Sequence, residues 1–178
     1  MSKSDDRRAV ILDALADHVL AQGLAGSSLR PLAQAAGISD RMLLYYFTDK
    51  AELVAAVLAT IAVRLTAMLE AAAAPPMPVD EVRARLVGIL MGDTVWPYMR
   101  VWLEMASLAS QEDATGNGRV FSTAGEAIGR GFYAWGLAQI TADTPEARAI
   151  DAARLLVTIE GMMLLKSVGM SDIARMAI

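Results

Sequence analysis

The feature that most constrains the fold of this chain is the absence of any segment in which apolar and polar residues alternate one by one. Ala, Leu, Met and Arg dominate the sequence, and these residues favour helices. Apolar residues recur at helical spacing, as in the series Ile11, Leu15 and Val19. The sequence therefore predicts an all-α fold. With 55% hydrophobic residues over 178 positions, the chain has enough apolar material for a core.

Composition also excludes several classes of function. The chain has no cysteine and one histidine, His18, which removes disulfide frameworks, most zinc sites and the usual nucleophilic triads. We therefore expect no cofactor, no metal and no enzymatic activity, with His18 a surface or half-buried packing residue.

The distribution of charge bears on membranes and on nucleic acid. The longest stretches without Asp, Glu, Lys or Arg, such as Gly131–Ala142, reach twelve residues, short of the roughly 18 that a membrane-spanning helix requires. The charged N-terminus has no signal-sequence pattern, so we expect a cytoplasmic protein with no membrane partner. The net charge is −4, and residues 1–50 carry six basic and six acidic residues. The acidic excess therefore lies in the remainder, which permits a DNA-facing N-terminal segment.

Capping residues and helix breakers divide the chain into expected helices. Ser4 and Gly23 bound the first helix, Ser28 and Gly37 bound a short second one, and the cluster Pro75-Pro76-Met77-Pro78 ends a long one. Asp49 and Glu52 resemble a capping box at the start of that long helix. The expected helices cover 5–22, 29–36, 40–46, 50–73, 79–91, 95–110, 119–140 and 144–168, with a polar loop over 111–118 and a tail to Ile178.

The two short helices on either side of Gly37 are too short to stand alone and must pack on the first helix. Together the three predict a helix-turn-helix, whose second helix enters the major groove of DNA. Spacing alone leaves two interpretations equally open, because structural helical hairpins are common in all-α proteins.

The residues of this segment are more specific than its spacing. Residues 29–39 read LRPLAQAAGIS, and Leu43, the run Tyr45-Tyr46-Phe47 and the run Asp49-Lys50-Ala51-Glu52-Leu53 follow. Over about Arg7–Leu58 this pattern resembles the N-terminal domain of the TetR family of transcriptional regulators; beyond it only length and helix pattern are similar. The resemblance implies a helix-turn-helix DNA-binding domain over 1–50 and a helical ligand-binding and dimerisation domain over 51–178. It also implies a homodimer that binds a pseudo-palindromic DNA operator and releases it when a small-molecule effector binds.

The candidate DNA-binding residues lie around the 40–46 helix. Arg41 is suited to bidentate hydrogen bonding with guanine, whereas Asp40 is repelled by phosphates unless it accepts from cytosine or anchors Arg41. Lys50 can hold a phosphate together with exposed amides at the start of its helix. Leu44 stands where the family often has a tyrosine. The full set is Ser28, Arg30, Ser39, Asp40, Arg41, Met42, Leu44, Tyr45, Tyr46 and Lys50, and the alternative for Arg41 is a solvated surface side chain.

The same segment contains the expected core. One of the two tyrosines is expected to pack inward while the other contacts phosphate. The expected core residues are Leu32, Ala36, Ile38, Leu43, Phe47 and Leu53.

The C-terminal part is expected to form the dimer and the ligand site. Gly125, Gly129 and Gly136 allow close helix approach, so 119–140 and the last long helix are interpreted as a four-helix interface with a second copy. The alternative is that both helices pack within one subunit. Aromatic and methionine side chains suggest an adaptable pocket, although each is also explained as core. The candidate ligand-binding residues are Trp96, Met99, Trp102, Glu104, Met105, Phe121, Phe132, Trp135, Met162 and Met163.

Glu104 is the most informative of these residues, because an unpaired carboxylate on an apolar helix is costly. It is expected to face a cationic or hydroxylated ligand, or else to form a salt bridge with Arg100 or an interface partner. The sequence thus favours a homodimeric one-component regulator, a repressor released by a small hydrophobic ligand. The alternative is a ligand-binding or scaffold protein whose helix-turn-helix is purely structural.

Overall fold

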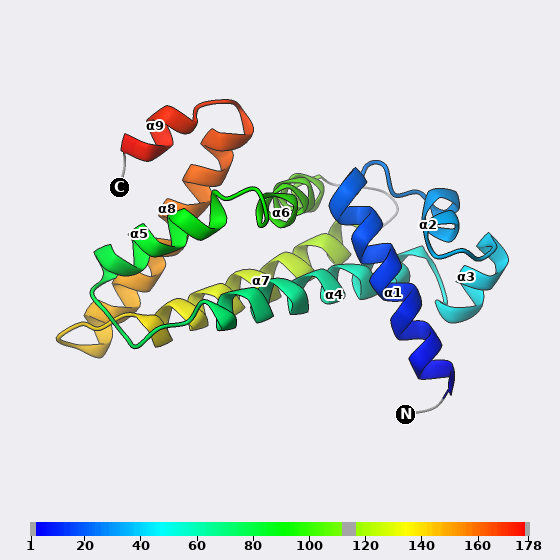
Figure 1. Cartoon of the computed structure of the whole chain (residues 1–178), viewed down its shortest axis with the longest axis horizontal. Helices are drawn as coiled ribbons and strands as arrows, with labels where there is room; N and C mark the ends of the chain where they lie inside the picture. Colours follow the sequence, from blue (N-terminus) through cyan, green and yellow to red (C-terminus); the bar gives the residue numbers. More distant parts are fainter. Residues whose placement is uncertain (1–2, 112–116, 177–178) are drawn as a thin grey trace. The chain divides into compact units, whose positions relative to one another are not determined.

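The computed structural model describes residues 3–111 and 117–176, which form helices and connecting turns with no β-strand among them (Figure 1). The all-α prediction is confirmed. The helices are α1 (Lys3–Gln22), α2 (Leu29–Ala35), α3 (Asp40–Tyr46), α4 (Lys50–Ala71), α5 (Val79–Leu90), α6 (Trp96–Ala109), α7 (Asn117–Gln139), α8 (Pro145–Ser167) and α9 (Ser171–Met176).

Most expected helix bounds agree with the structure to within two residues, and three expectations need correction. The first helix begins at Lys3, so Ser4 lies inside it and is not its N-cap. The long helix ends at Ala71, before the proline cluster. The tail contains α9, which sequence periodicity did not indicate because it has only six residues. Residues 112–116 of the expected polar loop lie outside the described part of the chain.

Contacts divide the chain into two compact units. Unit 1 comprises Met1–Ala67 and Arg100–Gly125, and unit 2 comprises Met68–Met99 and Glu126–Ile178. The boundaries fall inside α4, α6 and α7, so each of these three helices contributes residues to both units. The functional division expected at residue 50 is a different kind of boundary and remains a prediction.

Unit 1 is built on a core shared by α1 to α4. Ile11, Leu15 and Val19 of α1 are buried, as the helical spacing predicts. Leu32, Leu43, Phe47 and Leu53, which were expected in the core, are also buried, each at 2% exposure or less. Ala36 and Ile38 are only half-buried, because they lie in the turn that ends α2. These apolar contacts hold the two short helices that could not stand alone.

Within unit 1, α4 also has the length and composition of a membrane-spanning helix, with a window of mean hydropathy 1.9, and 28% of that window is buried. The buried residues of α4 include Val57 and Leu58. The side chain of Arg64, in the same helix, forms ion pairs with Asp13 at 2.9 Å and Asp17 at 2.6 Å, both on α1. The two ion pairs link α4 to α1 through a charged residue within the apolar window.

Unit 2 is built around α8. Its buried residues Leu155, Ile159, Met162 and Met163 form one face, and α8 contacts both α5 and α9. The proline-rich segment after α4 is fastened to the end of α7, because the amide of Met77 donates to the carbonyl of Gln139 at 2.9 Å and the amide of Thr141 donates back to Met77 at 2.9 Å.

Candidate nucleic-acid interface

The turn between α2 and α3 is formed by a defined helix-ending motif. Gly37 has φ +64°, a left-handed conformation that glycine adopts without strain. Its amide donates to the carbonyl of Gln34 at 3.0 Å, and the amide of Ile38 donates to the carbonyl of Ala33 at 3.0 Å. This pair of bonds is a Schellman motif, which ends α2 and sets the direction in which the chain enters α3.

Serine residues precede both short helices, but they act differently. Ser39 caps α3, because its hydroxyl accepts a hydrogen bond from the amide of Met42 at 3.2 Å. Ser28 occupies the N-cap position of α2, yet its side chain makes no capping bond and is exposed. The hydroxyl of Ser28 is therefore free of a structural role in that cap, which suits the phosphate contact predicted for it.

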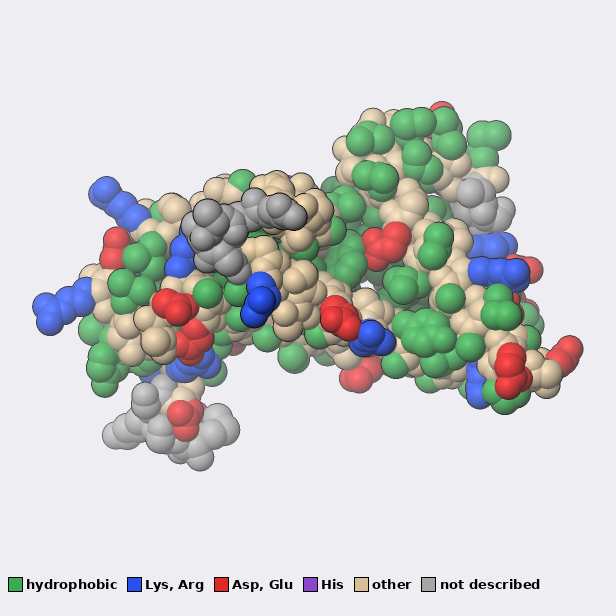
Figure 2. Space-filling view, turned by 180° about the vertical axis from the view of Figure 1, so that it is seen from behind, with side chains coloured by type: hydrophobic (Ala, Val, Ile, Leu, Met, Phe, Trp, Pro, Cys, Tyr) green, Lys and Arg blue, Asp and Glu red, His purple; other side chains and the backbone are tan. Residues whose placement is uncertain are grey.

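The exposed side of α3 carries the predicted DNA-binding residues. Leu43 is fully buried and anchors the helix, whereas Met42, Leu44 and Tyr45 are 42%, 45% and 77% exposed. The other exposed members of the predicted set are Arg30, Ser39, Asp40, Arg41 and Lys50. Figure 2 shows basic side chains protruding over α2 and α3. Leu43 therefore holds α3 in the core, while the neighbouring side chains, including Arg41 and Tyr45, are exposed to solvent.

The two tyrosines of α3 differ as expected. Tyr46 is half-buried and Tyr45 is exposed, and their rings meet edge to face with centroids 5.5 Å apart. Asp40 does not anchor Arg41 by an ion pair anywhere in the described structure, so that alternative for Asp40 is not seen. As the first residue of α3, the carboxylate instead interacts favourably with the helix dipole.

The start of α4 contains a capping box that is displaced by one residue. The Asp49 carboxylate accepts from the amide of Glu52 at 2.8 Å, but Glu52 accepts from the amide of Thr48 at 2.7 Å rather than from that of Asp49. This bond and, secondarily, Arg8 hold the pKa of Glu52 below its usual value. Two amides near this helix end are thus bound by carboxylates of the chain itself. The Lys50 side chain, rather than those amides, is left to meet a phosphate.

Arg8 is a residue that sequence reasoning missed. Its guanidinium pairs with Glu52 at 3.2 Å and stacks 4.7 Å from the centroid of the Phe47 ring. Through these two contacts Arg8 links α1 to the junction of α3 and α4. Only the spacing in three dimensions reveals this, because Arg8 and Glu52 are 44 residues apart.

The candidate ligand-binding residues divide between the two units. Trp102, Glu104, Met105 and Phe121 belong to unit 1, and Trp96, Met99, Phe132, Trp135, Met162 and Met163 belong to unit 2. The four methionines among them are buried at 4% exposure or less. They have the environment of core residues, which was the alternative for each.

The aromatic residues of unit 2 are engaged within the chain. The ammonium of Lys166 lies 4.2 Å from the centroid of the Trp96 ring and donates to the carbonyl of Met91 at 2.6 Å. Phe132 and Trp135 stack with centroids 5.9 Å apart.

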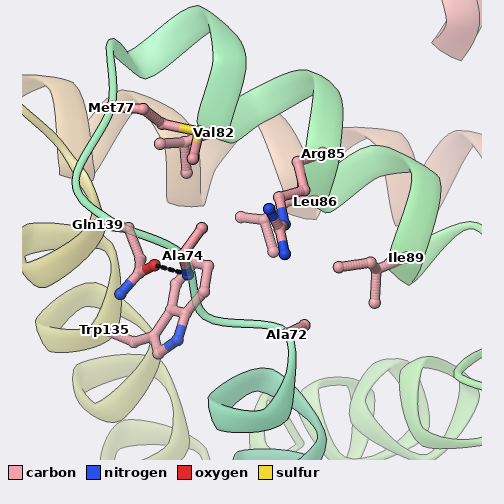
Figure 3. A pocket seen from close by; sticks show the side chains of 9 residues that line it. All are labelled: Ala72, Ala74, Met77, Val82, Arg85, Leu86, Ile89, Trp135 and Gln139. Atoms are coloured by element: carbon pink, nitrogen blue, oxygen red, sulfur yellow. Dashed lines mark hydrogen bonds between the residues drawn. The ribbon is translucent and has the colours of Figure 1, made fainter.

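A small cavity adjoins Trp135 (the unit 2 cavity). In Figure 3, Met77 and Val82 lie on one side of it and Trp135 and Gln139 on the other, where Gln139 accepts from the amide of Ala74 at 3.2 Å. Its volume is about 10 Å³, which is close to the space of one water molecule. The cavity beside Trp135 is too small for an effector.

A larger cavity lies within unit 1 (the unit 1 cavity). Its volume is about 470 Å³, in the range of small-molecule sites. Residues of α1, α2, α4, α6 and α7 line it, and of the predicted ligand-binding residues only Glu104 and Phe121 are among them. Lys50, predicted to contact DNA, also lines this cavity.

Glu104 is bound to the backbone of the turn between α1 and α2. Its Oε2 accepts from the amide of Leu24 at 2.7 Å and from that of Ala25 at 3.3 Å. Arg100, one turn earlier on α6, donates to the carbonyls of Leu20 at 2.7 Å and Ala21 at 3.3 Å. The expected salt bridge between Glu104 and Arg100 is therefore not formed. The pair instead caps the end of α1, an arrangement whose sequence signal was only their spacing of four residues.

The part of the chain that forms this interface also matches a known family. Residues 11–57 match the family model of bacterial regulatory proteins of the tetR family. Over these residues the chain is similar to the N-terminal domain of TetR-family proteins. No curated protein matches it in sequence.

Solved structures agree over most of the length. A transcriptional regulator from Rhodococcus sp. Rha1 is 25% identical, covers 88% of this chain and 81% of its own, and superposes with a TM-score of 0.65. The multidrug binding protein EbrR, solved with imidazole, is 24% identical with coverages of 96% and 92% and a TM-score of 0.64. Salmonella enterica GusR is 17% identical with coverages of 98% and 90% and a TM-score of 0.62. The latter two show the same fold.

The match of residues 11–57 and the similarity to the Rhodococcus regulator support a transcriptional regulator with a helix-turn-helix DNA-binding domain. The expectation that the protein is not an enzyme agrees with this similarity to regulatory proteins.

Proposed function

We propose that this protein is a TetR-type regulator: a cytoplasmic, homodimeric repressor that binds a palindromic operator through α3 and is released by a small hydrophobic effector. The observation that carries the proposal is the exposed side of α3. Arg41 and Tyr45 project from a helix that Leu43 and Phe47 anchor in the core. A rigid base with outward polar groups is the arrangement that reading a major groove requires.

In this proposal the residues of the interface divide by role. Arg41 contacts a guanine edge from the first turn of α3. Ser28, Tyr45 and Lys50 contact phosphates on either side, which sets the position of α3 in the groove. The remaining predicted residues complete the contact surface: Arg30, Ser39, Asp40, Met42, Leu44 and Tyr46.

Few cations are available for this task, which supports the need for two copies. Arg8 is engaged by Glu52 and Phe47, so Arg7, Arg30, Arg41 and Lys50 remain as exposed cations in the described part of the N-terminal segment. So small a number of phosphate contacts binds DNA weakly and is sensitive to salt. A dimer places two recognition helices about 34 Å apart, or a multiple of it, to meet successive major grooves.

An apolar stripe along α8, which ends at the C-cap residue Val168, supports dimerisation. Ile150, Val157, Leu164 and Val168 are 52%, 71%, 57% and 62% exposed. Exposed Ala153 and Gly161 lie between them, so the positions recur every three or four residues on one side of the helix. We call these six residues the α8 stripe. Figure 2 shows apolar side chains gathered over α8 and α9.

Of the glycines predicted to allow close helix approach, Gly125 and Gly136 face side chains of their own chain, and Gly125 lies near Met105. Gly136 lies against the side chains of Ala152 and Leu155, where an added Cβ would be 3.7 Å from the Ala152 Cβ. This glycine therefore serves packing within the chain. Gly131, in contrast, has open space beside it and lies with exposed Ala127, Ala134 and Ala138. Such small residues allow close approach of a second copy.

Release by an effector requires a ligand that favours the conformation unable to match the operator. A hundredfold loss of DNA affinity corresponds to about 2.8 kcal/mol of coupling between the two sites. α4 spans from Lys50 to Ala71 and contributes to both units, so it is the element through which we expect that coupling to act.

Selection of bound DNA from a random pool tests the proposal. The expected result is a palindromic consensus whose half-sites are separated by whole turns of the duplex. Two results would overturn it: a strictly monomeric protein in solution, or failure to retard any genomic fragment at low ionic strength.

A further inference from the structure

The strongest unassigned feature of the molecule is the unit 1 cavity, because it combines size, apolar walls and a fixed charge. At about 470 Å³ it is large enough for a small organic molecule. Val54 and Val57 of α4, Leu108 of α6 and Phe121 of α7 supply apolar and aromatic wall. Glu104 supplies a carboxylate on the same wall.

The fixed charge of this cavity is negative. The Glu104 carboxylate is half-buried and is held by two main-chain amides, both of which bind Oε2. No ion pair to Glu104 is present within the described residues. Lys50 also lines the cavity, but it is exposed and its long side chain can turn to water. A ligand therefore meets an anchored anion and a movable cation.

We propose that the unit 1 cavity binds a small amphipathic amine, with its apolar body against α4 and Phe121 and its protonated nitrogen paired with Glu104. Both amides bind Oε2, so the carboxylate still has capacity to accept a charge-assisted hydrogen bond from a protonated amine. An anionic ligand of the same shape is repelled by the same carboxylate.

The position of Glu104 also connects this cavity to the DNA-binding helices. An added Cβ on Gly23 would lie 2.5 Å from Oε1, so the carboxylate sits directly against the turn between α1 and α2. A cation that draws the carboxylate toward the cavity weakens its bonds to the amides of Leu24 and Ala25. This turn precedes α2 and α3, so ligand binding disturbs the placement of the recognition helix. The connection to release of DNA rests on the proposed function; binding itself does not.

Three probes with one body and different head groups test the site: 4-phenylbutylamine, 4-phenylbutanol and 4-phenylbutyrate, titrated by calorimetry into the full chain without DNA. We expect the amine to bind at least about tenfold more tightly than the alcohol, and the acid to bind most weakly. Tighter binding of the acid, or no saturable binding of the amine at millimolar concentration, would overturn the proposal.

Glu104→Gln removes the charge and keeps an oxygen to accept from the two amides. We expect this variant to lose the preference for the amine over the alcohol. Glu126→Gln is the matched control, since Glu126 is an exposed carboxylate of unit 2 paired with Arg130 at 2.8 Å, and it should keep the preference. A preference that persists in Glu104→Gln contradicts the proposal.

Leu108→Trp provides a test that does not touch the turn, because it fills the cavity from α6. Binding of all three probes should fall together, while thermal unfolding reports whether the variant is folded. Unchanged amine binding in folded Leu108→Trp would place the site elsewhere and overturn the proposal.

Gel retardation separates this inference from the proposed function. The amine should weaken operator binding by the wild-type chain more than by Glu104→Gln. A protein that binds the amine through Glu104 but retards no DNA refutes the proposed repressor and leaves the amine site standing. A protein that binds its operator but shows no amine preference refutes the site alone.

Discussion

Two cavities within the described residues differ in size and in the side chains that line them. The unit 2 cavity lies beside Trp135, in the unit that holds most of the aromatic and methionine candidates, yet it measures about 10 Å³. The unit 1 cavity measures about 470 Å³ and is lined largely by aliphatic residues, with one aromatic, Phe121. Large side chains fill space, so their concentration marks a packed core more readily than a binding site. Unit 2 combines this small cavity with an exposed apolar stripe along α8, whereas unit 1 combines the larger cavity with a helix, α3, that exposes Arg41 and Tyr45.

The largest effect should come from the exterior of unit 2. Val157→Lys puts a charge in the α8 stripe, and we expect a dimer to become a monomer by light scattering. Operator affinity should then fall by about 10²–10⁴-fold, because each half-site binds alone. Val63→Lys is the matched control, since Val63 is 68% exposed on α4, close to the 71% of Val157. A Val157→Lys variant that stays dimeric would show that the stripe has another role.

The interior of unit 2 should be nearly as sensitive. Trp135→Ala removes an indole from a filled region, and we expect a loss of about 2–4 kcal/mol in the free energy of unfolding by urea. The Nε1 of Trp135 is buried without a hydrogen-bond partner among the described residues. Trp135→Phe removes that unpaired donor and should cost much less. Equal losses in the two variants would contradict the view that volume is what this position supplies.

On the exterior of unit 1, Arg41→Ala should change DNA binding without changing stability or oligomeric state. We expect a loss of about 1–3 kcal/mol per half-site and relaxed preference at one base pair. Exposed Arg175 of α9 is the control for a simple change of charge. Lys50→Ala should instead weaken binding to all sequences and reduce the salt dependence. Identical behaviour of Arg175→Ala and Arg41→Ala would remove the assigned role of Arg41.

The smallest effect concerns acid stability of unit 1. The amide of Thr48 and, secondarily, Arg8 lower the pKa of Glu52 below its ordinary 4.5. The folded state therefore gains stability when Glu52 is ionised, and this gain is lost as pH falls through the lowered pKa. Glu52→Gln should be less stable than wild type at neutral pH, and the difference should shrink on acidification below about 4.5. Thermal unfolding across this range measures it, and a constant difference would argue against the displaced capping box.

The bounds and the buried residues of α3 were predictable from adjacent residues in the sequence. Ser39 and Gly37 predicted its start, and the helix runs from Asp40 to Tyr46 as expected, because caps and left-handed turns depend on adjacent residues. Burial of Leu43 and Phe47 followed from their spacing for the same reason. Exposure of Arg41 was equally predictable, since a charged residue on the opposite side of a short amphipathic helix faces solvent.

Long-range partners were not predictable in this way. Glu104 was expected to face a ligand or Arg100, and it binds two amides 79 and 80 residues earlier in the chain. Arg8 was counted as a charge, and it pairs with Glu52. Trp135 was placed in a pocket by its residue type, and it adjoins a cavity the size of one water molecule. In each case the residue type is compatible with several environments, and the sequence does not specify which of them the fold provides.

The amino-acid sequence alone determined the helical class, the bounds of the helix-turn-helix and the resemblance of residues 11–57 to the TetR N-terminal domain, because these depend on periodicity, capping and motifs that adjacent residues carry. Tertiary structure decided which charged side chains bind other groups of the chain, where a cavity is left in the packing, and which apolar helix faces are exposed. Those properties arise from contacts between residues distant in the chain, and the free energy of such contacts depends on geometry that residue type does not specify.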